Sequence, residues 1–112
     1  MNETSNYIIN AKSMVFLPSF NEYGEPNTMV LEEAETYTVS KKTYDVIDQG
    51  ARYYGTTIKT TKEIVKDVFG KINMAPVIIY SPQLLVFFPT QAFKDDLCAW
   101  FNAFSIVDVY SL

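Results

Sequence analysis

Histidine is absent from this 112-residue chain, and its absence removes more chemistry than any other feature of the composition. Without histidine there is no imidazole general base, no Ser-His-Asp or Cys-His nucleophile system, and no histidine ligand for a metal. The single cysteine, Cys98, cannot form an internal disulfide, and alone it cannot build a structural zinc site of the usual kind. We therefore expect no catalytic residue, no metal and no cofactor.

Long apolar runs are missing as well. No run approaches the ~18 to 20 apolar residues that a membrane helix needs. Residues 1–6 are polar and carry no positively charged side chain, unlike a secretory signal peptide. Together with the lone cysteine, these features predict a cytoplasmic protein in a reducing compartment, with no membrane partner.

The residues that are present suit a globular domain. Hydrophobic residues make up 48% of the chain and charged residues 20%, with eight tyrosines and eight phenylalanines. A chain of this length and composition can bury a core. We expect a single domain over residues 1–112 with a core rich in aromatic rings.

Charge is distributed unevenly along the chain. The overall net charge is −4, but residues 41–71 hold seven Lys and Arg against four Asp and Glu, a net charge of +3. The remaining residues hold two lysines and nine carboxylates, a net charge of −7. Such a basic segment in an acidic chain can direct a polyanion to one face of the molecule.

The first section of the sequence has the composition of β-strands. Residues 7–9 and 14–17 predict a hairpin around a turn at 10–13, and Pro18 is expected to end the second strand. After a loop at 21–27, the β-branched and apolar runs 28–31 and 36–39 predict two more strands. The acidic residues between those runs indicate a solvated turn rather than a metal site; they are Glu32, Glu33 and Glu35.

The hydrophobic period then changes to that of helices. Tyr44, Ile47, Ala51 and Tyr54 recur at three- and four-residue spacing and share one helical face. Gly55 follows where a left-handed C-terminal cap is expected. Tyr54 is therefore predicted to lie in the core.

A second helix is predicted next. Thr60 and Glu63 have the spacing of a capping box, and Gly70 is expected to end the helix. Lys62 and Lys66 are four residues apart and are expected to project from the other side of the helix, with Lys59 just ahead of them. The predicted core stripe consists of Ile64, Val65, Val68, Phe69 and Ile72.

The last third returns to strands. Residues 76–80 and 84–88 are apolar at both parities, which predicts strands covered on both faces, joined by a turn at 81–83. One or two further strands are expected within 97–109. Cys98 and Trp100 share a strand parity and are predicted to be core residues. The fold class is therefore α+β, a mainly antiparallel sheet with two central helices in the order β-β-β-β-α-α-β-β-β.

Three motifs, in order along the chain, resemble the ComK family of bacterial competence transcription factors. Residues 48–55 (DQGARYYG) are similar to a family helix that passes from acidic to basic and ends in two aromatics and a glycine. Residues 76–79 (PVII), leading to 87–90 (FFPT), are similar to its proline-led strand, turn and second strand. Residues 98–101 (CAWF) are similar to its Cys-x-Trp strand start.

The resemblance implies a transcription activator that binds AT-rich double-stranded promoter DNA as a homo-oligomer. It also implies control of protein level through an adaptor protein and a Clp protease. The family continues beyond the position that matches Leu112, so we expect a truncated form that corresponds to its N-terminal part. The apolar end of the chain, residues 106–110, agrees with that expectation.

The candidate DNA-binding residues are cationic or aromatic side chains of the basic segment. Lysine and arginine neutralise phosphates, and arginine also enters narrow A·T minor grooves. A solvated helix face is the alternative explanation for any one of these cations. The candidates are Arg52, Tyr53, Lys59, Lys62 and Lys66.

Two other functions are consistent with the sequence. A dimerisation or adaptor-recognition module without DNA binding fits the overall acidity. A small hydrolase or isomerase would use carboxylate pairs, either Asp45 with Asp48 or Asp95 with Asp96. Because acidic residues near a helix N-terminus are stabilised by the macrodipole, the first pair has a sufficient structural explanation.

Overall fold

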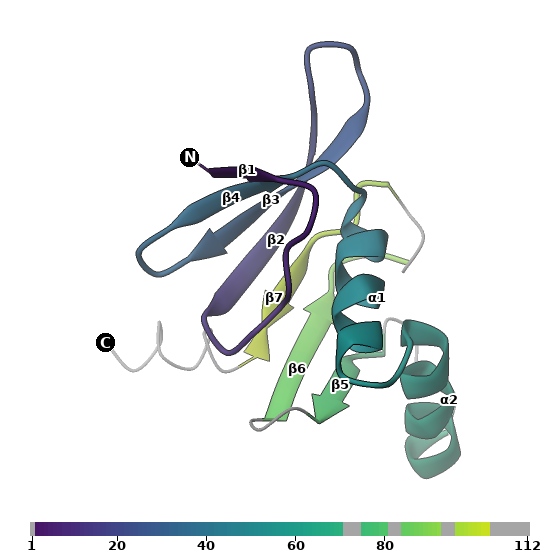
Figure 1. The fold of residues 1–112 in the computed structure, drawn as a ribbon. Helices are drawn as coiled ribbons and strands as arrows, with labels where there is room; N and C mark the ends of the chain where they lie inside the picture. Colours follow the sequence, from purple (N-terminus) through teal and green to yellow (C-terminus); the bar gives the residue numbers. More distant parts are fainter. Residues whose placement is uncertain (1, 71–74, 81–83, 93–95, 104–112) are drawn as a thin grey trace.

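The computed structural model describes residues 2–70, 75–80, 84–92 and 96–103, and its elements follow the predicted order (Figure 1). The fold is α+β, as expected. The predicted turn at 81–83, Ile72, Asp95 and the predicted strand residues after 103 lie outside the described residues. The elements are β1 (Asn2–Thr4), β2 (Ser13–Phe20), β3 (Pro26–Glu32), β4 (Thr36–Val39), α1 (Thr43–Tyr53), α2 (Ile58–Phe69), β5 (Val77–Tyr80), β6 (Leu84–Pro89) and β7 (Trp100–Asn102).

The described strands form one sheet in the order β1-β4-β3-β2-β7-β6-β5. Its pairs are antiparallel except for β1 with β4, which is parallel. The last three strands therefore add to the side of β2 that faces away from β3. At its far end the β2–β3 hairpin, which is paired as far as Phe20 with Pro26, projects beyond the rest of the sheet (Figure 1).

The core lies between the sheet and the two helices, and it is rich in rings as predicted. Trp100, Phe16 and Phe87 are its largest fully buried side chains, and Phe16 meets Phe87 edge to face with ring centroids 5.4 Å apart. Helix α1 contributes Val46, Ile47 and Ala51, and α2 contributes Ile58 and Val65. Cys98 is fully buried, and its carbonyl accepts a 2.7 Å hydrogen bond from the Thr43 hydroxyl. Cys98 and Trp100 are thus core residues, as predicted.

The prediction of a strand at 7–9 is wrong. Tyr7 and Ile9 are buried at alternate positions, as in a strand, but side chains replace the ladder of backbone bonds. The Tyr54 hydroxyl donates to the Ile9 carbonyl (2.9 Å), and the Asn10 amide donates to the Ile8 carbonyl (3.0 Å). The first strand is instead β1, a polar segment without a strand-like pattern.

Pro18 does not end the second strand, contrary to prediction. β2 continues to Phe20, with Pro18 opposite Thr28 of β3. On the other side of β2, the described part of β7 pairs only with Val15 and Phe16. Proline lacks a backbone N–H, and a strand tolerates it where one side has no partner.

The ends of the two helices follow from local chemistry. Gly55 has φ +87°, and the N–H groups of Gly55 and Thr56 donate to the carbonyls of Arg52 and Ala51, as in a Schellman cap. The N-terminal cap of α2 differs from the prediction. It is Thr57, whose hydroxyl accepts from the Thr60 N–H at 3.0 Å, and not Thr60.

Strands β5 and β6 are covered less completely than predicted. Val77, Ile79, Leu85 and Phe87 are buried, whereas the residues between them are half-buried or exposed. One face of this part of the sheet therefore packs on the core, and the other is open in part.

Candidate nucleic-acid interface

The three candidate lysines form one exposed face of α2. Lys59, Lys62 and Lys66 are exposed, and their spacing of three and four residues places them in one stripe along the helix. We call these three residues the lysine face. The helix is held from another side, where Ile58, Thr61 and Val65 are buried, so the lysines can point to solvent while α2 stays packed. The predicted position of Lys62 and Lys66 away from the core is confirmed.

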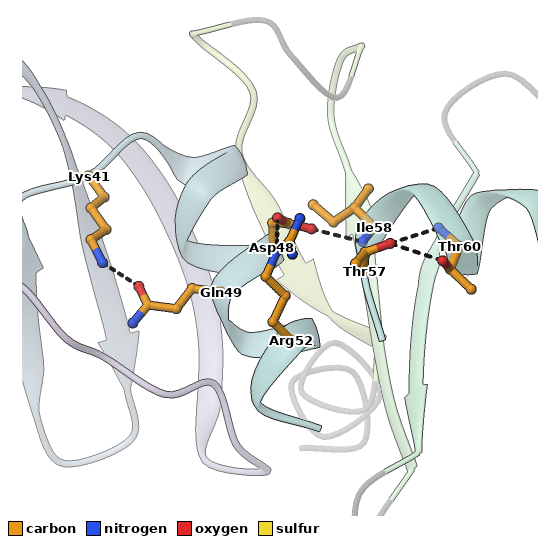
Figure 2. A network of polar contacts seen from close by, with 7 residues as sticks. All are labelled: Lys41, Asp48, Gln49, Arg52, Thr57, Ile58 and Thr60. Carbon is orange, nitrogen blue, oxygen red and sulfur yellow. Dashed lines mark hydrogen bonds and ion pairs between the residues drawn. The ribbon is translucent and has the colours of Figure 1, made fainter. Parts of the chain in front are cut away.

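Arg52 lies close to α2 through Asp48 (Figure 2). The Arg52 Nε donates to Asp48 Oδ2 at 2.8 Å, and the backbone N–H of Ile58 donates to Asp48 Oδ1 at 3.0 Å. One carboxylate thus joins the last turn of α1 to the first turn of α2. The arrangement links Arg52 to the first turn of α2, the turn that carries Lys59.

Arg52 forms an ion pair with Asp48. The hydrogen bond to Asp48, together with the negative charge of that carboxylate, raises the pKa of the guanidinium. Arg52 is exposed, and in solvent such a pair contributes little to stability. Its consequence is geometric, because it orients the guanidinium beside α2.

Tyr53 and Tyr54 differ in exposure. Tyr54 is partly buried against the core, and burial raises the pKa of its hydroxyl. Tyr53 is 66% exposed and rests edge to face on Tyr54, with ring centroids 5.0 Å apart. A ring supported in this way can offer an apolar surface to a groove or a base.

The predicted apolar stripe of α2 is only partly a core stripe. Val65 is buried, but Ile64, Val68 and Phe69 are 56%, 67% and 68% exposed. The helix therefore carries more apolar surface than the described part of the protein covers.

Several of the carboxylates considered in the sequence analysis form contacts that support the fold. Asp48 holds two helices, as described above, and Asp96 forms a 3.3 Å ion pair with Lys42. Of the acidic turn, Glu33 and Glu35 are exposed, whereas Glu32 accepts a hydrogen bond from the Tyr7 hydroxyl. Within the residues that the structure describes, no group of three potential ligands is arranged for a metal ion, and no helix is long and apolar enough to cross a membrane.

We compared the sequence of the chain with models of known protein families. The family described as ComK protein matches residues 4–112 of the chain. The chain belongs to the ComK family. No curated protein and no solved structure gives a significant match.

Membership in the ComK family assigns the chain to the competence transcription factors, which are not enzymes. The hydrolase alternative is therefore set aside. The structure places the five candidate residues at the end of α1 and along α2.

Sequence reasoning about this ComK-family site missed Asp48 as the link between the two helices. The four-residue spacing of Asp48 and Arg52 was a usable signal, because side chains at that spacing meet on a helix. The contact with Ile58 had no such signal, because it depends on how the chain turns between α1 and α2. Separately, Lys41 donates a hydrogen bond to Gln49, the residue that follows Asp48 on α1 (Figure 2).

Proposed function

We propose that this protein regulates competence genes by binding AT-rich promoter DNA through the lysine face and the end of α1. The observation that carries the proposal is the stripe of three exposed lysines on one side of a packed helix. Cations in a row can follow a phosphate backbone, and most non-specific affinity for DNA comes from such contacts. The helix lies within the basic segment, residues 41–71, of an otherwise acidic chain.

Arg52 and Tyr53 would add preference for A·T sequences. The narrow minor groove of A·T tracts has an enhanced negative potential that attracts arginine, and exposed side chains can enter the groove to contact base edges or part base steps. Both residues are exposed at the end of α1. The link of Arg52 to α2 through Asp48 supports one continuous DNA-binding surface.

The test compares Lys62→Ala with Lys12→Ala in duplex-binding titrations over a range of salt. Lys12 is exposed in the turn before β2, so it gives the same change of charge outside the proposed surface. For each lysine that contacts a phosphate, the slope of log affinity against log salt falls in magnitude by about 0.9. We expect that change for Lys62→Ala and not for Lys12→Ala; equal slopes in both variants would refute the assignment.

The wider proposal includes assembly and control. As in the family resemblance, we propose that the protein binds DNA in the cytoplasm as a homo-oligomer and that an adaptor protein with a Clp protease limits its amount. A module that only recognises a protein partner remains the second candidate, favoured by the exposed Ile64, Val68 and Phe69. Reversing all three lysines to Glu separates the two, because it would abolish duplex binding but leave a protein association through Ile64 and Val68.

A further inference from the structure

The tip of the β2–β3 hairpin carries two exposed aromatic side chains at the far end of a projecting arm. Phe20 is 51% exposed and Tyr23 is 79% exposed. Exposed apolar surface of this kind on a protruding element is typical of a contact site, because tyrosine and phenylalanine gain much from burial. Glu22 and Glu25 are exposed beside them. We call Phe20, Glu22, Tyr23 and Glu25 the hairpin tip.

Hydrogen bonds hold the backbone of the hairpin tip in one shape. The side-chain oxygen of Asn21 accepts from the N–H groups of Tyr23 and Glu25, both at 2.9 Å. The Asn21 N–H donates to the Glu25 carbonyl at 2.9 Å, and Gly24 allows the turn with φ +78°. A preorganised loop loses little conformational freedom when it binds, so more of the contact energy becomes affinity.

The hairpin tip belongs to a strongly acidic part of the chain. Residues 13–40 contain five glutamates and no lysine or arginine. A surface that complements the tip must therefore combine cations with an exposed apolar side chain. It must also lie where the tip can reach it.

The lysine face together with Phe69 combines cations with an exposed apolar side chain. Phe69 follows Lys62 by seven residues and Lys66 by three, so it extends the same stripe. Phe69 is 68% exposed. An acidic, aromatic tip and a cationic helix ending in an aromatic are complementary in charge and in apolar surface.

We infer that the hairpin tip of one copy docks on the lysine face and Phe69 of a second copy. Within one chain the two surfaces lie at opposite ends of the molecule (Figure 1), so the contact must join different copies. Tyr23 would pack on Phe69, and Glu22 and Glu25 would pair with Lys62 and Lys66. Because DNA is proposed to use the same lysines, this contact belongs to the DNA-free protein.

Charge reversal and its rescue test the contact, with sedimentation velocity in DNA-free buffer over a range of concentration as the measurement. The wild-type chain is expected to self-associate, and less so at high salt. Glu22→Lys with Glu25→Lys, or Lys62→Glu with Lys66→Glu, should each weaken association about tenfold or more, because like charges then meet. All four substitutions in one chain should restore association, because the charges are again opposite.

The control is Glu33→Lys with Glu35→Lys, the same charge change in the exposed turn between β3 and β4, which should leave association unchanged. A monomeric wild type, an unaffected tip variant, or no rescue in the fourfold variant would each overturn the inference. The fourfold variant is expected to self-associate without binding duplex DNA. Failure of this contact is thus distinguishable from failure of the proposed DNA surface.

Discussion

Gly50 and Ile9 are packed so closely that each residue depends on the other. A Cβ at position 50 would lie 2.4 Å from Ile9 Cγ1 and 2.6 Å from its Cδ1. Both residues are fully or nearly fully buried, so neither side has room to move. The absence of a side chain in the middle of α1 lets the segment before β2 lie against the helix.

Gly50→Ala should therefore lower the free energy of unfolding. Overpacking costs about 1–3 kcal/mol, and the better helix propensity of alanine returns about 1 kcal/mol. In an Ile9→Ala background the clash is gone, so the same substitution should be neutral or stabilising. Urea unfolding of the four chains in this cycle measures the coupling; the same loss in both backgrounds would contradict the packing account.

The buried hydroxyl of Tyr7 is expected to make the free energy of unfolding depend on pH in the alkaline range. Burial, followed by the hydrogen bond to Glu32, raises the pKa of its hydroxyl well above the usual value. A group whose pKa is raised on folding contributes stability that is present below the unfolded pKa, about 10 for tyrosine. That stability is lost as pH rises toward the folded pKa.

We therefore expect the free energy of unfolding to fall above pH 10, and to fall less steeply in Tyr7→Phe. The difference in slope is at most about 1.4 kcal/mol per pH unit for one proton. Urea unfolding at a series of alkaline pH values gives the slopes, with Tyr23→Phe at an exposed tyrosine as the control. Parallel slopes in wild type and Tyr7→Phe would exclude this role for Tyr7.

Helix α2 shows at the scale of elements how local sequence fixes a boundary. Thr57 accepts the Thr60 N–H, and Gly70 ends the helix with φ +81°. The spacing of Thr60 and Glu63 predicted a cap one turn too late, because only Thr60 has a glutamate three residues later, whereas Thr57 caps the helix without one. Only the path of the chain from Gly55 selects Thr57.

Thr57→Ala should lower the free energy of unfolding by about 1 kcal/mol, the usual cost of a lost N-terminal cap. Thr60→Ala is the matched comparison, since Thr60 is exposed and its N–H survives the substitution. It should cost less than about 0.5 kcal/mol, as exposed substitutions usually do. Urea unfolding decides between them, and an equal or larger cost at Thr60 would restore the capping box that the sequence suggested.

The hydrophobic period of the sequence predicted the helices and strands well, but it predicted less well which of their faces are buried. The strands 28–31 and 36–39, both helices and the two apolar strands after them were all recognisable. Periodicity does not tell what packs against a face, so the exposure of Val68 and Phe69 was not foreseen. The strand prediction for residues 7–9 was wrong for a different reason. These residues bury alternate side chains, as a strand does, but the carbonyls of Ile8 and Ile9 accept hydrogen bonds from side chains and not from a neighbouring strand.

At the scale of the whole molecule, charge separates along the sequence and in space. The acidic loops at the two ends of β3, at 21–25 and 33–35, lie far from helix α2 and its lysine face (Figure 1). The stripe of lysines was readable from spacing alone. The link from Asp48 to Ile58 was not, because it joins residues that only the folded chain brings together.

The central claim is that α2 and the end of α1 form a DNA-binding surface. The most direct measurement is fluorescence anisotropy of a labelled AT-rich duplex with the wild-type chain, from low to physiological salt, with a G·C-rich duplex alongside. The account predicts binding that weakens as salt rises and that favours the AT-rich duplex. Absence of binding even at low salt, or affinity independent of salt, would contradict it.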